Sequence, residues 1–227
     1  MTTVADETVT IPAPAPERGS LRLVLTAIIA VAVVAIAVAG GYFWGNRDTS
    51  SGAAKPTAVD IGFARDMATH HQQAITMAAY VRDNSSDANI VTLAYDIESS
   101  QTIQMGEMTG WLDTWNLTRY TAHPMVWMGP EHASHVVNGL MPGMATPDQI
   151  TRLMSLHGKA LDVLFLQLMI RHHQGGVVMA QYAEQNASQD YVRTLAGNML
   201  AAQSAEIVQM EQMLRQRGGV PLPAPAT

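Results

Sequence analysis

The segments 63–72 (FARDMATHHQ) and 165–174 (FLQLMIRHHQ) carry one motif twice, Phe-x-x-x-Met-x-x-His-His-Gln, at a spacing of 102 residues. The register continues without a gap along the chain on both sides of the motif. Identical residues that recur in a single frame indicate an internal duplication, with repeat units at 59–118 and 159–217. Further matching pairs are Asp60 and Asp162, Met77 and Met179, Gln101 and Gln203, Met108 and Met210, and Leu112 and Leu214.

Each repeat unit is predicted to form two helices. From Phe63 to Val81, apolar and histidine side chains recur at steps of three and four residues, which is the period of one helical face. The polar run 83–86 (DNSS) interrupts this stripe before a second one begins, and the other unit has its break at 186–188. Two amphipathic hairpins bury their apolar faces best against each other, so we expect an all-α domain, a four-helix bundle, at 59–217.

A long connecting segment, 119–146, joins the two units. Its prolines and glycines argue against one continuous helix. It ends in Thr146-Pro-Asp-Gln149, which is a helix start: a Thr cap, Pro at the first helical position, and Gln three residues after the cap. We therefore expect one additional short helix before the second unit.

The N-terminal part of the chain predicts a location. A short cytoplasmic tail (1–20) precedes an uncharged apolar run, and about 22 such residues at about 1.5 Å each suffice to cross a hydrocarbon layer. We predict a single-pass transmembrane helix at 21–44. Arg18 and Arg22 lie at its start, and the positive-inside rule then leaves the N-terminus in the cytoplasm.

The segments around the domain are predicted to be flexible: a small, polar linker at 45–58 and a Gly/Pro/Ala tail at 218–227. An alternative to the membrane anchor is a cleaved signal peptide, because Ala37-Val38-Ala39 matches a small-residue cleavage site. Both alternatives place the helical domain outside the cytoplasm, in the first case tethered to the cell membrane.

Composition excludes several classes of function. The chain has no cysteine, which rules out a disulfide framework, a cysteine zinc site and a thiol nucleophile. With a net charge of −6 and 14% charged residues, it is a poor nucleic-acid binder. No Glu-x-x-His, His-Glu-x-x-His or Gly-x-Ser-x-Gly motif occurs in the sequence, so we expect neither an enzyme nor an organic cofactor.

The sequence is instead rich in methionine and histidine, with 15 Met and 8 His. Thioether sulfur is a soft ligand that suits Cu(I), and imidazole suits copper in both oxidation states. Two adjoining helices that each present Met and His predict a mixed N/S copper site. The candidate ligands are Met67, His70, His71 and Met77 in the first unit and Met169, His172, His173 and Met179 in the second.

A purely structural explanation of these residues stays open. Methionine is a flexible core-filling residue, and a buried histidine is often simply hydrogen-bonded. Gln101 and Gln203 lie on inward-facing stripes, where they would satisfy His70 and His172 or, around a metal, orient their rings. A possible secondary metal site, or alternatively a set of side chains that anchor the connecting segment, comprises His132, His135, Met141 and Met144.

The paired Phe-x-x-x-Met-x-x-His-His segments, together with the run 139–146 (GLMPGMAT), resemble the extracytoplasmic domain-of-unknown-function family 305 (DUF305). The resemblance covers nearly all of 59–217. It implies a ferritin-like bundle, and it implies copper binding because some members of the family are implicated in copper binding and tolerance.

Two functions follow as expectations. The first is a membrane-anchored, extracytoplasmic metal-binding protein that buffers or handles copper through His and Met ligands. The alternative is a structural or interaction bundle that docks onto another membrane protein complex, with Met and His serving as core. Methionine is favoured on adaptable binding surfaces, so composition alone does not decide between the two functions.

Overall fold

The structure, a computed structural model, describes residues 55–226. The predicted cytoplasmic tail, transmembrane helix and most of the linker lie outside these residues. Within 55–226, no helix is both long enough and apolar enough to cross a membrane.

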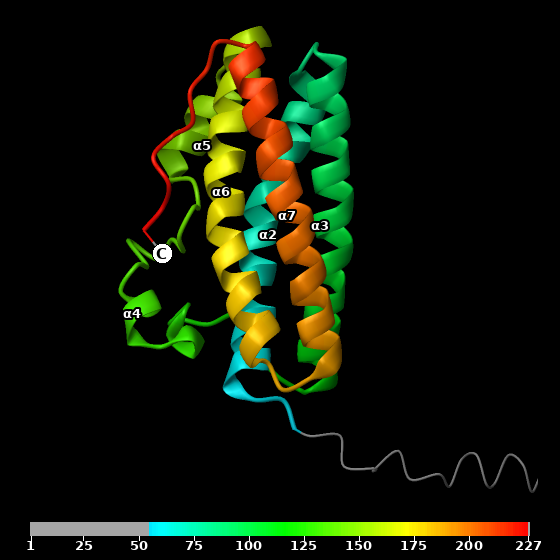
Figure 1. Cartoon of the computed structure of the whole chain (residues 1–227), viewed down its shortest axis with the longest axis vertical. Coiled ribbons are helices and arrows are strands. Elements are labelled where there is room, and N and C mark those ends of the chain that lie inside the picture. Colours follow the sequence, from blue (N-terminus) through cyan, green and yellow to red (C-terminus); the bar gives the residue numbers. More distant parts are fainter. Residues whose placement is uncertain (1–54, 227) are drawn as a thin grey trace, which may run out of the picture. The chain divides into compact units, whose positions relative to one another are not determined.

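Four long helices form two antiparallel hairpins (Figure 1). The first hairpin pairs α2 (Ala58–Asn84) with α3 (Ala88–Thr114), and the second pairs α6 (Gly158–Asn186) with α7 (Asp190–Gln216). The hairpins pack on each other mainly through α2 and α6, which run in opposite directions. The prediction of an all-α domain built from helical hairpins is confirmed, whereas the ferritin-like relation stays a prediction.

Each hairpin holds the turn of the other through a buried aspartate at a helix start. The Asp60 carboxylate accepts hydrogen bonds from the Ser188 hydroxyl (2.7 Å) and from the backbone N–H of Ser188 (3.0 Å) and Gln189 (2.9 Å). In the other direction, the Ser85 hydroxyl donates to Asp162 (2.7 Å). The two aspartates therefore fix the mutual position of the hairpins, a structural role.

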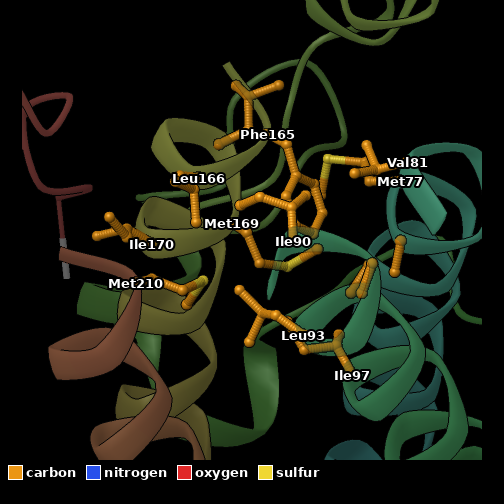
Figure 2. Close-up of a cluster of buried hydrophobic side chains, with 14 of the residues drawn as sticks. Met77, Val81, Ile90, Leu93, Ile97, Phe165, Leu166, Met169, Ile170 and Met210 are labelled. Atoms are coloured by element: carbon orange, nitrogen blue, oxygen red, sulfur yellow. The ribbon is translucent and has the colours of Figure 1, made fainter. Parts of the chain in front are cut away.

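The core consists of two apolar clusters. The first includes Met77, Phe165, Met169 and Met210, and Figure 2 shows these side chains converging from different helices. The second lies toward the other end of the helices and includes Phe63, Met67, Met108, Met179 and Met199. Along each long helix the two clusters are separated by buried polar residues, called here the histidine layer: His70, His71, Gln101, His172, His173 and Gln203.

The connecting segment lies against α2 and α6 and contains the short helices η1 (Val126–Met128) and α4 (Pro130–Ala133), and the short helix α5 (Pro147–Met154) follows it. The buried Asp66 carboxylate accepts from the Met125 backbone N–H (2.6 Å) and the Trp127 indole N–H (2.7 Å). Helix α5 begins with the expected capping box between Thr146 and Gln149. Side chains of α2 thus anchor the segment at its start.

Candidate metal centre

The structure brings His70 and His172 into contact midway along the helical domain. Their ring centroids are 3.7 Å apart with an interplanar angle of 31°, and both side chains are buried. His70 comes from α2 and His172 from α6, the two helices through which the hairpins meet. The duplicated residues therefore converge in one place, as the twinned motif predicts.

Backbone carbonyls fix the orientation of these two rings. His70 Nε2 lies 3.2 Å from the Pro142 carbonyl oxygen, and His172 Nε2 lies 3.1 Å from the carbonyl oxygen of His70. Because a carbonyl can only accept a hydrogen bond, each Nε2 carries the proton in the neutral ring. The lone pair of each imidazole consequently resides on Nδ1.

The adjoining histidines have the same tautomer for a similar reason. His71 Nε2 lies 2.8 Å from Gln104 Oε1, and His173 Nε2 lies 2.7 Å from Glu206 Oε2. Within the described chain, the Nδ1 atoms of His70, His71 and His173 are buried and have no hydrogen-bond partner. These free nitrogen lone pairs in the core are of the kind that a metal ion requires.

Electrostatics keeps the rings neutral. Burial lowers the pKa of His70 to about 3 and that of His71 to about 4, and burial likewise lowers the pKa of His172 well below its usual value. Neighbouring histidines lower these pKa values further, because a proton on one ring repels a proton on the next. The imidazoles of His70, His71 and His172 are thus in their metal-binding form without competition from protons at neutral pH.

The four candidate methionine ligands are all fully buried, on both sides of the histidine layer. Met67 and Met179 belong to the second apolar cluster, while Met77 and Met169 belong to the first. Figure 2 shows Met77 and Met169 among apolar side chains. Each thioether therefore has a packing role in this structure, and its role as a ligand stays a prediction.

The histidine layer is not a finished coordination sphere. Among residues 55–226, no group of three or more His, Asp or Glu side chains is arranged to hold a metal ion. An ion in this layer would have to use thioethers as well as imidazoles, or the rings would have to rotate.

Gln101 and Gln203 lie in the layer without a hydrogen bond to the rings among the described residues, and their role in orienting the rings around a metal stays a prediction. Their amide oxygens are buried and make no hydrogen bond in the part of the chain that the structure describes. The imidazole N–H groups are held instead by Gln104, Glu206 and two carbonyls. Gln104 and Glu206 lie 33 residues after His71 and His173 and three residues after Gln101 and Gln203, almost one helical turn further along.

The turn 141–144 closes the layer on one side. Gly143 has φ +84°, and a Cβ there would overlap the Arg171 carbonyl oxygen of α6; a Cβ on Gly175 would overlap the Pro142 carbonyl oxygen. Backbone can approach backbone this closely only because both positions are glycine. Gln73 strengthens the contact through two hydrogen bonds with the backbone of Ala145 (2.9 and 2.6 Å). The glycines thus bring the Pro142 carbonyl to His70.

The predicted secondary site is only partly assembled. His135, Met141 and Met144 line a pocket of about 410 Å³, and the His132 ring lies 6.4 Å from that of His135 without lining the pocket. Arg171 lines the same pocket, where burial lowers its pKa, and no acidic residue is among the described lining residues. Arg171 donates a hydrogen bond to Gln149 (2.8 Å) and has no ion pair within residues 55–226, so its positive charge disfavours a cation nearby and copper binding here stays a prediction with an electrostatic cost.

Sequence reasoning missed Gln104, Glu206 and Pro142. A signal existed for the first two, because Gln104 and Glu206 are themselves 102 residues apart and hence equivalent in the duplication. The pair was overlooked because its members are not identical. Nothing in the sequence indicated that the Pro142 carbonyl, which has no counterpart in the duplicated motif, would contact a histidine.

Taken together, two packed helical hairpins and a buried histidine layer at their crossing define the class of this protein: an all-α domain with a duplicated histidine core. The chain belongs to the DUF305 family, a domain of unknown function, whose model matches residues 60–214. The resemblance drawn from the sequence is thereby confirmed. A comparison with the curated proteins finds no match.

Solved structures of the family are similar over most of their length. A DUF305 protein of Streptomyces coelicolor, predicted to be secreted, is 42% identical, with a TM-score of 0.66, over 73% of this chain and 96% of its own. A DUF305 fragment from Deinococcus radiodurans is 32% identical, with a TM-score of 0.60, over 72% of this chain and 99% of its own.

CopM is a relative whose structure has been solved with copper. In its Cu(I)-bound form it is 28% identical, with a TM-score of 0.54, over 70% of this chain and 98% of its own. CopM is also known in a Cu(II)-bound form, which is 25% identical over 69% of this chain. The chain is therefore homologous to a protein that binds copper in both oxidation states.

Proposed function

We propose that this protein binds copper within the histidine layer and thereby buffers or hands on the ion outside the cytoplasm. The observation that carries the proposal is the set of buried imidazoles whose Nε2–H groups are all hydrogen-bonded, while the Nδ1 lone pairs of His70, His71 and His173 have no partner in the described residues. A buried nitrogen without a partner costs about 1–3 kcal/mol. A bound ion would remove that cost.

The donor set favours copper. Imidazole nitrogens bind copper in both oxidation states, and the thioethers of Met67, Met77, Met169 and Met179 would add soft ligands for Cu(I). The copper-bound forms of the relative CopM support the same choice. The protein's own contribution is to bury the imidazoles and to orient them through Pro142, Gln104 and Glu206.

The proposed location rests on the N-terminal sequence and on the similarity to a DUF305 protein predicted to be secreted. An anchor at 21–44, with the N-terminus in the cytoplasm, would tether the domain to the outer face of the cell membrane. Separation of membrane and soluble fractions, with and without residues 1–44, tests this part of the proposal. Recovery of the full chain in the soluble fraction would contradict it.

The double substitution His70→Gln with His172→Gln tests the site. Glutamine retains an N–H donor near the position of Nε2 but has no imidazole lone pair, so the carbonyl contacts can persist. We expect the full chain to lose Cu(I) binding in a competition titration against a Cu(I) chelator, and the control His123→Gln, at an exposed position, to bind normally. If the folded double variant competes for copper as well as the unchanged chain does, the site is wrong.

A further inference from the structure

The two halves of the histidine layer differ in charge at one polar contact. His71 and His173 are equivalent in the duplication, both are buried, and each donates its Nε2–H to the residue 33 positions later. In the first half the acceptor is the neutral amide of Gln104, whereas in the second half it is the carboxylate of Glu206. His70 and His172 both donate to neutral backbone carbonyls, His70 to that of Pro142 and His172 to that of His70.

A carboxylate at this position changes the ring more than an amide does. A negatively charged acceptor on Nε2–H increases the electron density at Nδ1 and therefore its strength as a donor to a metal. Such a contact also places a negative charge near a bound cation in a medium of low dielectric constant. Loss of an outer contact of this kind costs about 10–100-fold in metal affinity.

Glu206 is free to exert this effect. Its side chain is only 23% exposed, and its one ion pair within residues 55–226 is the contact with His173. No described lysine or arginine neutralises the carboxylate. The distance from His71 Nε2 to Gln104 Oε1 is 2.8 Å, and that from His173 Nε2 to Glu206 Oε2 is 2.7 Å. At this contact the two halves therefore differ in the charge of the acceptor and not in its distance.

We propose that Glu206 makes the second half of the layer, with His173 as its strongest nitrogen donor, the tighter half of the copper site. This inference rests on the proposed function. Glu206 is a positioning residue that acts through the His173 ring, and Gln104 keeps the first half weaker. A site with one strong and one weak half can retain an ion on one side while it exchanges ligands on the other.

Reciprocal substitutions test the inference, because Gln104 and Glu206 provide matched controls for each other. Cu(I) affinity is measured on the full chain for His71→Gln and His173→Gln, each in the unchanged background, in Glu206→Gln, and in the swap Gln104→Glu with Glu206→Gln. We expect His173→Gln to weaken binding about 10-fold or more beyond His71→Gln in the unchanged background. The two losses should become equal in Glu206→Gln and reverse in the swap.

A merely structural role for Glu206 would not reverse the order of the two losses. Equal losses in the unchanged background, or an order that the swap leaves unaltered, would overturn the inference while the copper site itself stands. Absence of Cu(I) binding by the unchanged chain would instead overturn the proposed function, and the inference with it.

Discussion

His70 and His172 stack inside the protein because neither ring carries a charge. Burial and the neighbouring histidines depress the pKa of His70 to about 3, and the pKa of His172 is also well below normal. A proton on either ring would face both a desolvation penalty and repulsion from the other ring at a centroid distance of 3.7 Å. The contact therefore exists only for the neutral forms.

For the same reason, the free energy of unfolding should decrease as the pH is lowered. In the unfolded chain these histidines gain protons below about pH 6.5, while the folded state does not take them up until about pH 4 for His71 and about pH 3 for His70. The contribution of these rings to the free energy of unfolding is therefore fully present above about pH 6.5. It is lost as the pH falls below that value, by about 1.4 kcal/mol per pH unit and per imidazole.

Urea unfolding between pH 7.5 and 4.5 measures this slope, with His71→Gln as the test variant and the exposed His123→Gln as control. We expect His71→Gln to reduce the slope by about one proton, or about 1.4 kcal/mol per pH unit, and the control to leave it unchanged. A metal-free protein whose stability is flat over this range would contradict the account of buried neutral rings.

The methionines allow ligand and packing roles to be separated. Leucine fills nearly the same volume as methionine but has no sulfur, and such exchanges usually cost less than about 1.5 kcal/mol. We expect Met67→Leu with Met169→Leu to leave the fold intact and to weaken Cu(I) binding. Met108→Leu with Met210→Leu, another buried and duplicated pair, is the matched control and should bind copper normally. If the two double variants change Cu(I) binding equally, Met67 and Met169 have only a packing role.

At the scale of elements, the turn 141–144 completes the histidine layer from outside the duplicated hairpins. It reaches His70 because Gly143 and Gly175 let the backbone of the turn lie directly on α6. Asp66 and Gln73, which both lie on α2, hold the connecting segment by hydrogen bonds to its backbone. The segment therefore supplies an acceptor for the first half of the layer that the duplication itself does not provide.

Gly175→Ala should disrupt this contact. The new Cβ would overlap the Pro142 carbonyl oxygen, so the turn must shift and His70 loses its acceptor. Thermal unfolding should show a loss of about 1–3 kcal/mol. Gly106→Ala is the control, because that exposed helical glycine has open space around it and alanine there should stabilise by about 0.5–1 kcal/mol. A Gly175→Ala protein as stable as the control would contradict the close packing of the turn.

The helices and the convergence of His70 with His172 were predictable because both depend on local periodicity and on the register of the duplication. The contacts of the connecting segment were not, because they involve backbone atoms whose position depends on the path of a loop without a repeat. The acceptors of His71 and His173 were predictable in part. Residues 104 and 206 share a register, but the difference between Gln and Glu concealed their common role.

At the scale of the whole molecule, a polar layer interrupts what would otherwise be one continuous apolar core. The layer contains buried nitrogens and amide oxygens without partners among the described residues, each at a cost of about 1–3 kcal/mol. Apolar side chains of similar volume would remove this cost, so stability alone does not account for the layer. The proposed ion at the junction of the hairpins would account for the layer and would also link the two halves of the domain.

The coordination of copper by Nδ1 is the central claim, and long-range ¹H–¹⁵N correlation spectra of the ¹⁵N-histidine-labelled full chain test it most directly. On addition of Cu(I), which is diamagnetic, we predict that the Nδ1 resonances of His70, His71 and His173 shift while their Nε2 atoms remain protonated. Unchanged core resonances, with shifts confined to His132 and His135 or to exposed histidines, would contradict the account.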